Sequence, residues 1–220
     1  PGGAALAAEP PRPLDEPVSD ARRWGILVET NKCDPECTAC VTACEGEHGL
    51  TGHGRPASDA QWIRKVDLEN RETGHRKSLP VMCQHCEHPP CVDVCPTGAS
   101  MKRVDGIVQV NKHICIGCRY CLMACPYKAR NFVHEELHDQ KPYSPRGKGT
   151  AESCNMCVHR IDAGLEPACV VACNSKGGGA MTFGDVKDPD SAIARKRKAM
   201  ATQAIRADLG TNPGVRYTGL

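Results

Sequence analysis

The chain has 220 residues, similar numbers of acidic and basic side chains and a net charge of +2, a balance that argues against nucleic acid as its main partner. No run approaches the roughly 20 consecutive apolar residues of a transmembrane helix, so we expect no direct membrane span. Aromatic residues are scarce, with two Trp, two Phe and four Tyr, whereas there are sixteen cysteines. Cysteine chemistry is therefore predicted to organise the fold, because so lean a core needs metal sites, disulfides or a partner.

The predicted elements follow the cysteines along the chain. Residues 1–21 are rich in Pro, Ala and acidic residues, which predicts a disordered or extended arm. Within this arm Gly2 to Ala8 are small and apolar, as in the tail of an export signal. Elsewhere, period-two apolar patterns predict strands, and good helix formers after an Asp and a Ser predict a C-terminal helix. We expect strands at residues 23–28, 61–68 and 107–110, helices within or just after each cysteine group, and the C-terminal helix at residues 190–209.

The sixteen cysteines fall into four groups of four, and none is left over. An internal repeat of this kind indicates a repeated structural unit. The groups are Cys33, Cys37, Cys40 and Cys44; Cys83, Cys86, Cys91 and Cys95; Cys115, Cys118, Cys121 and Cys125; and Cys154, Cys157, Cys169 and Cys173.

The third group has the spacing of the bacterial ferredoxin run, in which three cysteines are two residues apart, a fourth follows three residues later, and a proline comes next. Three such thiolates wrap a tight loop around three irons of a cubane, while the fourth ligates the neighbouring cluster. We expect Cys125 to start a helix with Pro126 in its first turn, where an amide hydrogen bond is not needed.

The other groups vary this spacing. The second group has a four-residue gap before its third cysteine, and the fourth group stretches the same gap to eleven residues. The first group has three residues between Cys33 and Cys37, and we expect the extra residue to bulge at Asp34-Pro35. Taken alone, this triad resembles that of radical S-adenosylmethionine enzymes. Those enzymes need a large β/α barrel, however, and here three ferredoxin-type groups share the chain.

Other cysteine chemistries fit this pattern less well. An even cysteine count in an exported chain is compatible with disulfides, but three closely spaced cysteines followed by Cys-Pro form a ligand spacing. Structural zinc sites use two separate pairs rather than runs of four, and no pair is followed by the His that c-type haem attachment needs. His85 and His88 lie in a cysteine loop, where we expect them to hydrogen-bond or shield sulfur rather than act as ligands.

Residues 22–220 resemble the four-cluster iron–sulfur subunits of the dimethyl sulfoxide reductase superfamily. Within that family, the irregular first group and the run from Glu45 to Leu50 are similar to the exported subunits of the membrane complex associated with dissimilatory sulfite reductase. The segments that carry the resemblance are 23–27, 80–86, 167–169, 182–185, 188–191 and 216–217.

The resemblance implies four [4Fe–4S] clusters whose ligands come from paired groups, the first with the fourth and the second with the third. Two departures from the family pattern affect the first pair, namely the longer gap between Cys33 and Cys37 and Asn174 where a proline often follows. The implied ligand sets are Cys33, Cys37, Cys40 and Cys173; Cys44, Cys154, Cys157 and Cys169; Cys83, Cys86, Cys91 and Cys125; and Cys95, Cys115, Cys118 and Cys121.

We therefore expect an α+β fold of two pseudo-symmetric ferredoxin-like modules with inserted loops and a C-terminal helix. The outer module spans residues 22–80 and 127–190 and carries the first and fourth groups. The inner module spans residues 81–126 and carries the second and third groups. Residues 191–220 form the C-terminal helix and tail.

The resemblance implies a one-electron relay without a substrate site of its own. Its partners would be an integral membrane quinone-reactive subunit and a multihaem cytochrome c or another redox subunit of a sulfur-metabolism complex. We expect a peripheral protein on the periplasmic side of the cytoplasmic membrane, exported folded with its signal peptide removed. Two alternatives stay open: the relay subunit of a molybdopterin oxidoreductase for sulfite, polysulfide or tetrathionate, and a metal-stapled structural subunit without a redox role.

Overall fold

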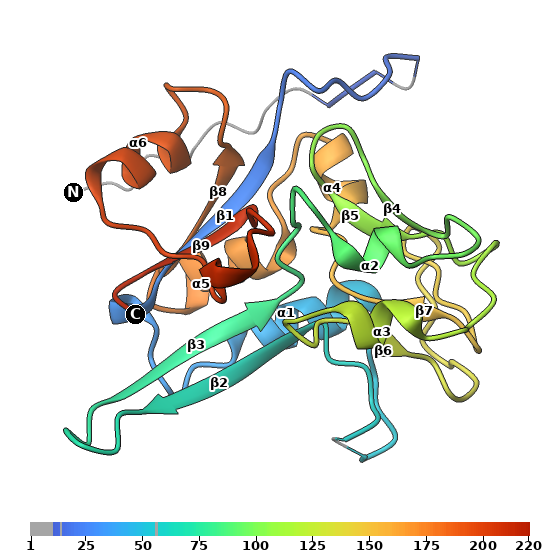
Figure 1. Ribbon diagram of the computed structural model, residues 1–220, viewed down its shortest axis with the longest axis horizontal. Coiled ribbons are helices and arrows are strands. Elements are labelled where there is room, and N and C mark those ends of the chain that lie inside the picture. The colour runs from blue at the N-terminus through green and yellow to red at the C-terminus, as the bar shows by residue number, and fades with distance from the viewer. Residues whose placement is uncertain (1–10, 14, 56) are drawn as a thin grey trace.

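Strand β1 (Trp24–Glu29) is the centre of the main sheet, and all six of its residues are buried. It pairs antiparallel with β8 (Met181–Asp185) and parallel with β9 (Val215–Thr218). Segments from both ends of the chain therefore meet in one three-stranded sheet (Figure 1). The structure, a computed structural model, describes residues 11–13, 15–55 and 57–220.

Three two-stranded antiparallel ladders accompany this sheet in the described residues. The longest is a hairpin that projects from the body of the molecule, and the two shorter ladders lie on the opposite side (Figure 1). The pairs are β2 (Ile63–Glu69) with β3 (Arg76–Met82), β4 (Ser100–Lys102) with β5 (Val108–Val110), and β6 (Asn131–Phe132) with β7 (Ala151–Glu152).

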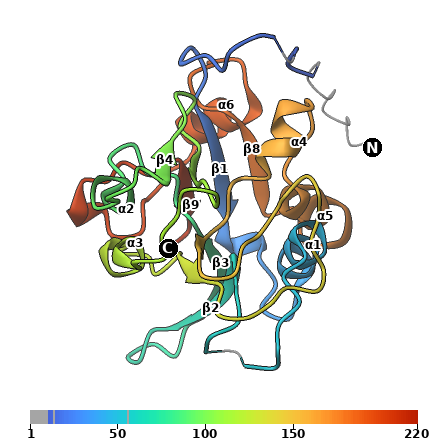
Figure 2. The same ribbon diagram turned by 90° about the vertical axis from the view of Figure 1, so that its right-hand side faces the viewer.

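Helices α1 (Ala39–His48) and α5 (Ala168–Lys176) pack against each other (Figure 2). Three further helices have only one turn or slightly more, which is too short for a helix to be stable alone in water. As predicted, all five lie within or directly after a cysteine group. No helix of the described residues is long and apolar enough to cross a bilayer. The short helices are α2 (Pro90–Asp93), α3 (Tyr120–Ala124) and α4 (Val158–Asp162), and 3-10 turns η1 and η2 lie at Thr30–Lys32 and Ala207–Leu209.

The expected mixture of short helices and strands is confirmed. The strands predicted at residues 23–28, 61–68 and 107–110 are present as β1, β2 and β5, with ends shifted by at most two residues. Strand β9 was not predicted, because its pairing partner β1 lies at the far end of the chain.

The predicted C-terminal helix over residues 190–209 is wrong in its second half. Helix α6 (Ala192–Ala199) begins as expected, with the Ser191 hydroxyl as its N-cap, but it ends at Ala199. The chain then runs beside β9, because the backbones of Gln203 and Tyr217 exchange two hydrogen bonds of 2.7 and 2.9 Å. Tertiary pairing therefore overrides the helix preference of this segment.

The expectation that Cys125 starts a helix is also wrong. Helix α3 ends at Ala124, and Cys125 adopts an extended conformation directly after it. Cys95 lies in the same way just after Val94, the C-cap of α2. Pro126 therefore marks the end of a helix rather than its first turn, because proline cannot continue the amide ladder.

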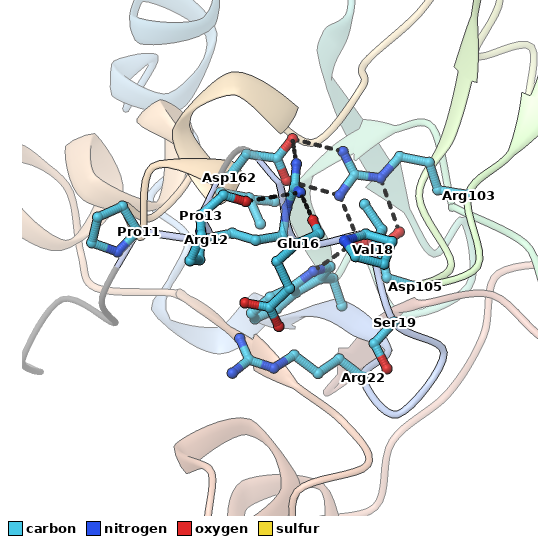
Figure 3. A pocket seen from close by; sticks show the side chains of 13 residues that line it. Pro11, Arg12, Pro13, Glu16, Val18, Ser19, Arg22, Arg103, Asp105 and Asp162 are labelled. Atoms are coloured by element: carbon cyan, nitrogen blue, oxygen red, sulfur yellow. Dashed lines mark hydrogen bonds and ion pairs between the residues drawn. The ribbon is translucent and has the colours of Figure 1, made fainter.

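The described part of the N-terminal arm contacts α4 through Arg12 (Figure 3). The Arg12 amide donates to the Asp162 carbonyl at 3.0 Å, and its guanidinium lies 3.5 Å from the Asp162 carboxylate. Arg103 binds the same carboxylate with two hydrogen bonds of 3.0 and 2.9 Å. Residues 11–13 and 15–21 contain no helix or strand, whereas the segment that resembles an export signal, residues 2–8, lies outside the described residues.

Cysteines supply much of the core that the scarce aromatic residues leave unfilled. Most of the sixteen belong to one buried apolar cluster, together with Ile26, Met82 and Tyr217. Trp24 and Phe183 stack at one edge of it, with ring centroids 5.1 Å apart. The fold is thus built around its thiols, and the sheet positions the loops that carry them.

Tyr217 provides a test of this core, because it is fully buried in β9. Its hydroxyl donates to the Pro80 carbonyl and accepts from the Gln84 side chain, both at 3.1 Å. Tyr217→Ala should lower the free energy of unfolding by about 3–5 kcal/mol, as for other large aromatic truncations in cores. The measurement is the guanidinium midpoint of the purified protein under anaerobic conditions.

Two further variants separate packing from surface effects. Tyr217→Phe keeps the ring and should cost only about 1–3 kcal/mol, from two unpaired polar partners. Arg206→Ala removes an exposed ion pair with Asp208 and should leave the midpoint unchanged. Equal midpoints for Tyr217→Ala and Arg206→Ala would contradict the packing described here.

Candidate metal centres

Three cavities in the structure are each lined by four cysteines. In each cavity, three cysteines come from one sequence group and the fourth from another. These are three of the four combinations that the resemblance implies. We name them set A (Cys33, Cys37, Cys40, Cys173), set C (Cys83, Cys86, Cys91, Cys125) and set D (Cys95, Cys115, Cys118, Cys121).

The remaining four cysteines, Cys44, Cys154, Cys157 and Cys169, are also gathered in one place, and we name them set B. All four are buried. Burial raises the pKa of Cys44 well above its usual value, and the neighbouring thiols of the other three members raise it further. Cys169 likewise lies close to Cys154 and Cys157.

The geometry of helices explains why each set combines cysteines from two sequence groups. Cys40 and Cys44 lie one turn apart on α1, and Cys169 and Cys173 lie one turn apart on α5. Side chains four residues apart project from one face of a helix at different heights along its axis. The two helices pack so that Cys40 is close to Cys173 in set A and Cys44 is close to Cys169 in set B.

The same arrangement recurs at α2 and α3, which also pack against each other. Cys91 lies in α2 with Cys95 just beyond its end, and Cys121 and Cys125 occupy the corresponding positions at α3. Set C takes Cys91 and Cys125, whereas set D takes Cys121 and Cys95. The two cysteines that end each group therefore serve two different sets.

The four sets are connected in the order A, B, C, D. A thiol in one set raises the pKa of a thiol in the next set, which shows that the two sets are neighbours. Neighbouring sets are close at Cys40 and Cys44, at Cys154 and Cys83, and at Cys91 and Cys121.

The exposure of the cysteines changes along this row. All members of sets B and C are buried, whereas each end set contains partly exposed members, Cys33 and Cys37 in set A and Cys95 and Cys115 in set D. Cys118 of set D is exposed to solvent. The row therefore reaches the surface at both ends and is shielded in its middle.

Backbone amides donate hydrogen bonds to cysteine sulfur around the sets. The amide of Met156 lies 3.4 Å from Cys154 Sγ, and that of Ser100 lies 3.3 Å from Cys95 Sγ. Hydrogen bonds of this kind favour the thiolate over the thiol. In the set D loop, Gly117 has a φ of 72°, and a Cβ there would lie 2.3 Å from the carbonyl oxygen of the neighbouring Gly149. Only glycine fits that position.

A turn absorbs the extra residue of the first group. The Cys37 amide donates to the Asp34 carbonyl at 3.1 Å, close to the bulge expected at Asp34-Pro35. Lys65 of β2 holds this loop, because its Nζ lies 3.3 Å from Cys33 Sγ and donates to the carbonyls of Asp34 and Cys37 at 2.7 and 3.2 Å.

Two buried histidines approach the thiols of set B. His85 accepts from the Val108 amide at Nδ1 (3.0 Å), and its Nε2 lies 3.8 Å from Cys154 Sγ, in line with the contact to sulfur expected for it. His48 Nε2 lies 3.2 Å from Cys157 Sγ. Burial lowers the pKa of both imidazoles to about 3. The second predicted histidine, His88, is exposed and makes no hydrogen bond to cysteine in the described part of the chain.

Arg130 also contacts sulfur without having been predicted, as do His48 and Lys65. Its Nη2 donates to Cys91 Sγ at 3.2 Å and to the Ser100 hydroxyl at 2.9 Å. These three residues lie 39, 109 and 32 positions from the cysteines that they contact, in the order Arg130, His48, Lys65. No local spacing in the sequence marks them.

The donor set fits iron–sulfur clusters. None of the sixteen cysteines is in a disulfide. Burial raises the pKa of Cys40, Cys86 and Cys154 to about 11, so these thiols stay protonated at neutral pH unless a metal binds their thiolates. Among the described residues, no three His, Cys, Asp or Glu side chains are arranged to hold a metal ion, and the cysteines surround cavities instead. Soft thiolate donors favour such clusters.

Comparisons with known proteins agree with this chemistry. Residues 75–186 match the family model of the 4Fe-4S dicluster domain. The chain is 41% identical to the Hdr-like menaquinol oxidoreductase iron–sulfur subunit 1 of Archaeoglobus fulgidus, over 93% of this chain and 86% of that protein. It is 38% identical to the B subunit of tetrathionate reductase from Salmonella typhimurium, over 92% and 74% of the two chains. It is 40% identical to the protein NrfC of Escherichia coli, over 87% and 78%.

The chain therefore belongs to the 4Fe-4S dicluster family, among the iron–sulfur subunits of the molybdopterin oxidoreductase β-subunit type. It is an electron-transfer subunit of an oxidoreductase complex rather than a catalytic subunit. The expected ferredoxin-like 4Fe-4S domain is confirmed over the matched residues.

The contact between Lys65 and the set A loop can be tested by removing the ammonium group. Lys65→Met should speed the loss of iron from the protein about tenfold, because a charge-assisted hydrogen bond contributes about 1.5–3 kcal/mol. The measurement is anaerobic iron transfer to a coloured chelator. Arg76→Met, on the same hairpin, breaks only an exposed ion pair with Glu69 and serves as the control. Identical release curves for the two variants would show that Lys65 does not hold the loop.

Proposed function

We propose that this chain holds four [4Fe–4S] clusters, one in each of sets A to D, and relays single electrons along the row. The observation that carries the proposal is the connected order of the sets, with buried cysteines in the middle and exposed ones at the ends. When bound, such clusters supply one-electron redox chemistry at potentials set by hydrogen bonds, net charge and exposure. The cysteines hold them, the amides and imidazoles near sulfur adjust them, and the apolar core excludes water.

The proposal extends to the two pseudo-symmetric modules. Sets A and B share helices α1 and α5 of the outer module, residues 22–80 and 127–190, while sets C and D share α2 and α3 of the inner module, residues 81–126. The repeated exchange of cysteines between two packed helices supports this division.

The set D end of the row, where Cys118 is exposed, is the proposed docking face for a redox partner. Cys118 lies on the surface, and Ile116 and Met123 beside it are 67% and 68% exposed, an unusual exposure for apolar side chains. A partner that covers these side chains would exclude water from set D and bring its own redox group close to Cys118. Apolar contact of this kind suits a protein partner rather than a small substrate.

The partners that we propose are a membrane quinone-reactive subunit and a multihaem cytochrome c or similar redox subunit, on the periplasmic side of the membrane. The name of the Archaeoglobus relative, a menaquinol oxidoreductase subunit, supports a quinol-linked complex. Within the family we favour the O subunit of the DsrMKJOP complex of dissimilatory sulfur metabolism. The similarity to the B subunit of tetrathionate reductase favours the second candidate, the relay subunit of a molybdopterin enzyme.

Cysteine variants test the number of clusters and their ligands. Cys44→Ala combined with Cys154→Ala should cost no more iron than Cys154→Ala alone, because both cysteines belong to set B. Cys33→Ala combined with Cys154→Ala should cost the iron of two sets. The measurements are iron and sulfide per chain and a reductive titration followed by EPR.

Two outcomes would refute the proposal. If each sequence group bound its own cluster, combining Cys44→Ala with Cys33→Ala would cost no more iron than Cys33→Ala alone. Combining Cys44→Ala with Cys154→Ala would then cost the iron of two clusters. If the wild-type clusters could not be reduced, the chain would be a structural subunit held together by metal and not a relay.

The docking face is tested by Ile116→Glu, with Leu68→Glu on the projecting hairpin as the matched control, since Leu68 is also exposed. Ile116→Glu should slow electron exchange with the quinone-reactive subunit or the cytochrome by at least about tenfold, as expected for a central interface residue. The iron content of both variants should be unchanged. Equal rates in the two variants would show that this face is not the docking site.

The identity of the complex has its own test. A molybdopterin subunit in the purified native complex would favour the second candidate over the DsrMKJOP complex.

A further inference from the structure

Arg130 places a positive charge in the interior of the protein without a carboxylate to balance it. Its side chain is only 6% exposed, and within the described residues no ion pair joins it to Asp or Glu. Its Nη1 is buried and has no hydrogen-bond partner in the described part of the chain. An unpaired buried charge is costly, so its counter-charge has to be supplied by something else at this position.

The groups around the guanidinium are cysteine thiols. Nη2 lies 3.2 Å from Cys91 Sγ of set C, and its other hydrogen bond goes to the neutral Ser100 hydroxyl. The Ser100 amide in turn donates to Cys95 Sγ of set D at 3.3 Å. Arg130 therefore lies where set C meets set D, in contact with a cysteine sulfur that can carry its counter-charge once a metal is bound.

Among the described residues, no comparable charge contacts the sulfur atoms of the other sets. Set A is contacted by Lys65, which is partly exposed, so that solvent screens its ammonium group. Set B is contacted by the imidazoles of His48 and His85 rather than by a guanidinium or an ammonium group. In set D the sulfur atoms accept hydrogen bonds from backbone amides, and the set reaches the surface. A full charge in a dry interior acts much more strongly than any of these.

We propose that the Arg130 guanidinium makes set C the most easily reduced site of the row, so that an electron entering the chain is held first in its buried middle. The inference rests on the proposed function, because it takes set C to hold a [4Fe–4S] cluster. Reduction there adds one electron and no proton, so the net charge at the site falls by one unit. The electron is supplied by the one-electron site of a neighbouring set and leaves to the next. A fixed positive charge against sulfur favours the more negative state.

Neutral and charged replacements of Arg130 separate charge from packing. Arg130→Gln should lower the equilibrium constant for reduction at set C at least tenfold, which corresponds to about 59 mV for a one-electron couple. Arg130→Lys keeps the charge and should recover most of that loss. Arg76→Met, which breaks only an exposed ion pair with Glu69, should leave set C unchanged. The measurement is a potentiometric titration of the whole complex followed by EPR, with iron per chain determined for every variant.

A second measurement uses the wild-type complex and does not depend on any variant folding. Protein labelled with ¹⁵N in arginine alone is reduced by one electron equivalent and examined by pulsed EPR. The first site to be reduced should show a coupling to ¹⁵N, because Arg130 is the arginine that donates to a cysteine sulfur among the described residues.

The outcomes are distinguishable from failure of the proposed function. Absence of reducible clusters in the wild type would overturn the relay itself. Intact clusters with an unchanged constant in Arg130→Gln, or an equal loss in Arg130→Lys and Arg130→Gln, would overturn only the role of the Arg130 charge. So would a first-reduced site without ¹⁵N coupling.

Discussion

The fold depends on pairs of cysteines that lie one helical turn apart and serve two different sites. On α1 and α5, Cys44 and Cys169 face one set while Cys40 and Cys173 face the next. Buried thiols resist ionisation, so a protein that gathers so many of them in its core needs metal to hold their thiolates. The short helices, the glycine turn at Gly117 and the sheet that joins both ends of the chain all bring these cysteines together.

This constraint also determines what the molecule can do. Helices that exchange cysteines keep neighbouring sets close, which is the geometry an electron relay needs. Buried residues such as His48 and Arg130 contact sulfur in the middle sets, whereas the end sets reach solvent near Cys33 and Cys118. Because charge and hydrogen bonds adjust the potential of a cluster, the same residues that fill the core also adjust the relay. The same buried residues therefore contribute to both the stability and the redox function of the protein.

Much of the local structure could be predicted from the sequence, because cysteine spacing and strand patterns are short-range signals. Spacing identified the four groups and the helices beside them, and the family resemblance implied the sets in which the structure brings the cysteines together. Long-range contacts were not visible. The helix expected over residues 190–209 stops at Ala199, because Gln203 pairs with Tyr217. Lys65 and Arg130 contact sulfur from distant segments, and no pattern near either residue marks that role.

The central claim is that four clusters lie in one row in the order A, B, C, D. The most direct measurement is anomalous X-ray scattering at the iron edge from crystals of the anaerobically purified protein. The account predicts four separate iron peaks, with the two end peaks beside Cys33 and Cys118 and the two middle peaks beside Cys157 and Cys91. Fewer peaks, or a peak at each sequence group without the exchange of Cys44 and Cys173, would contradict it.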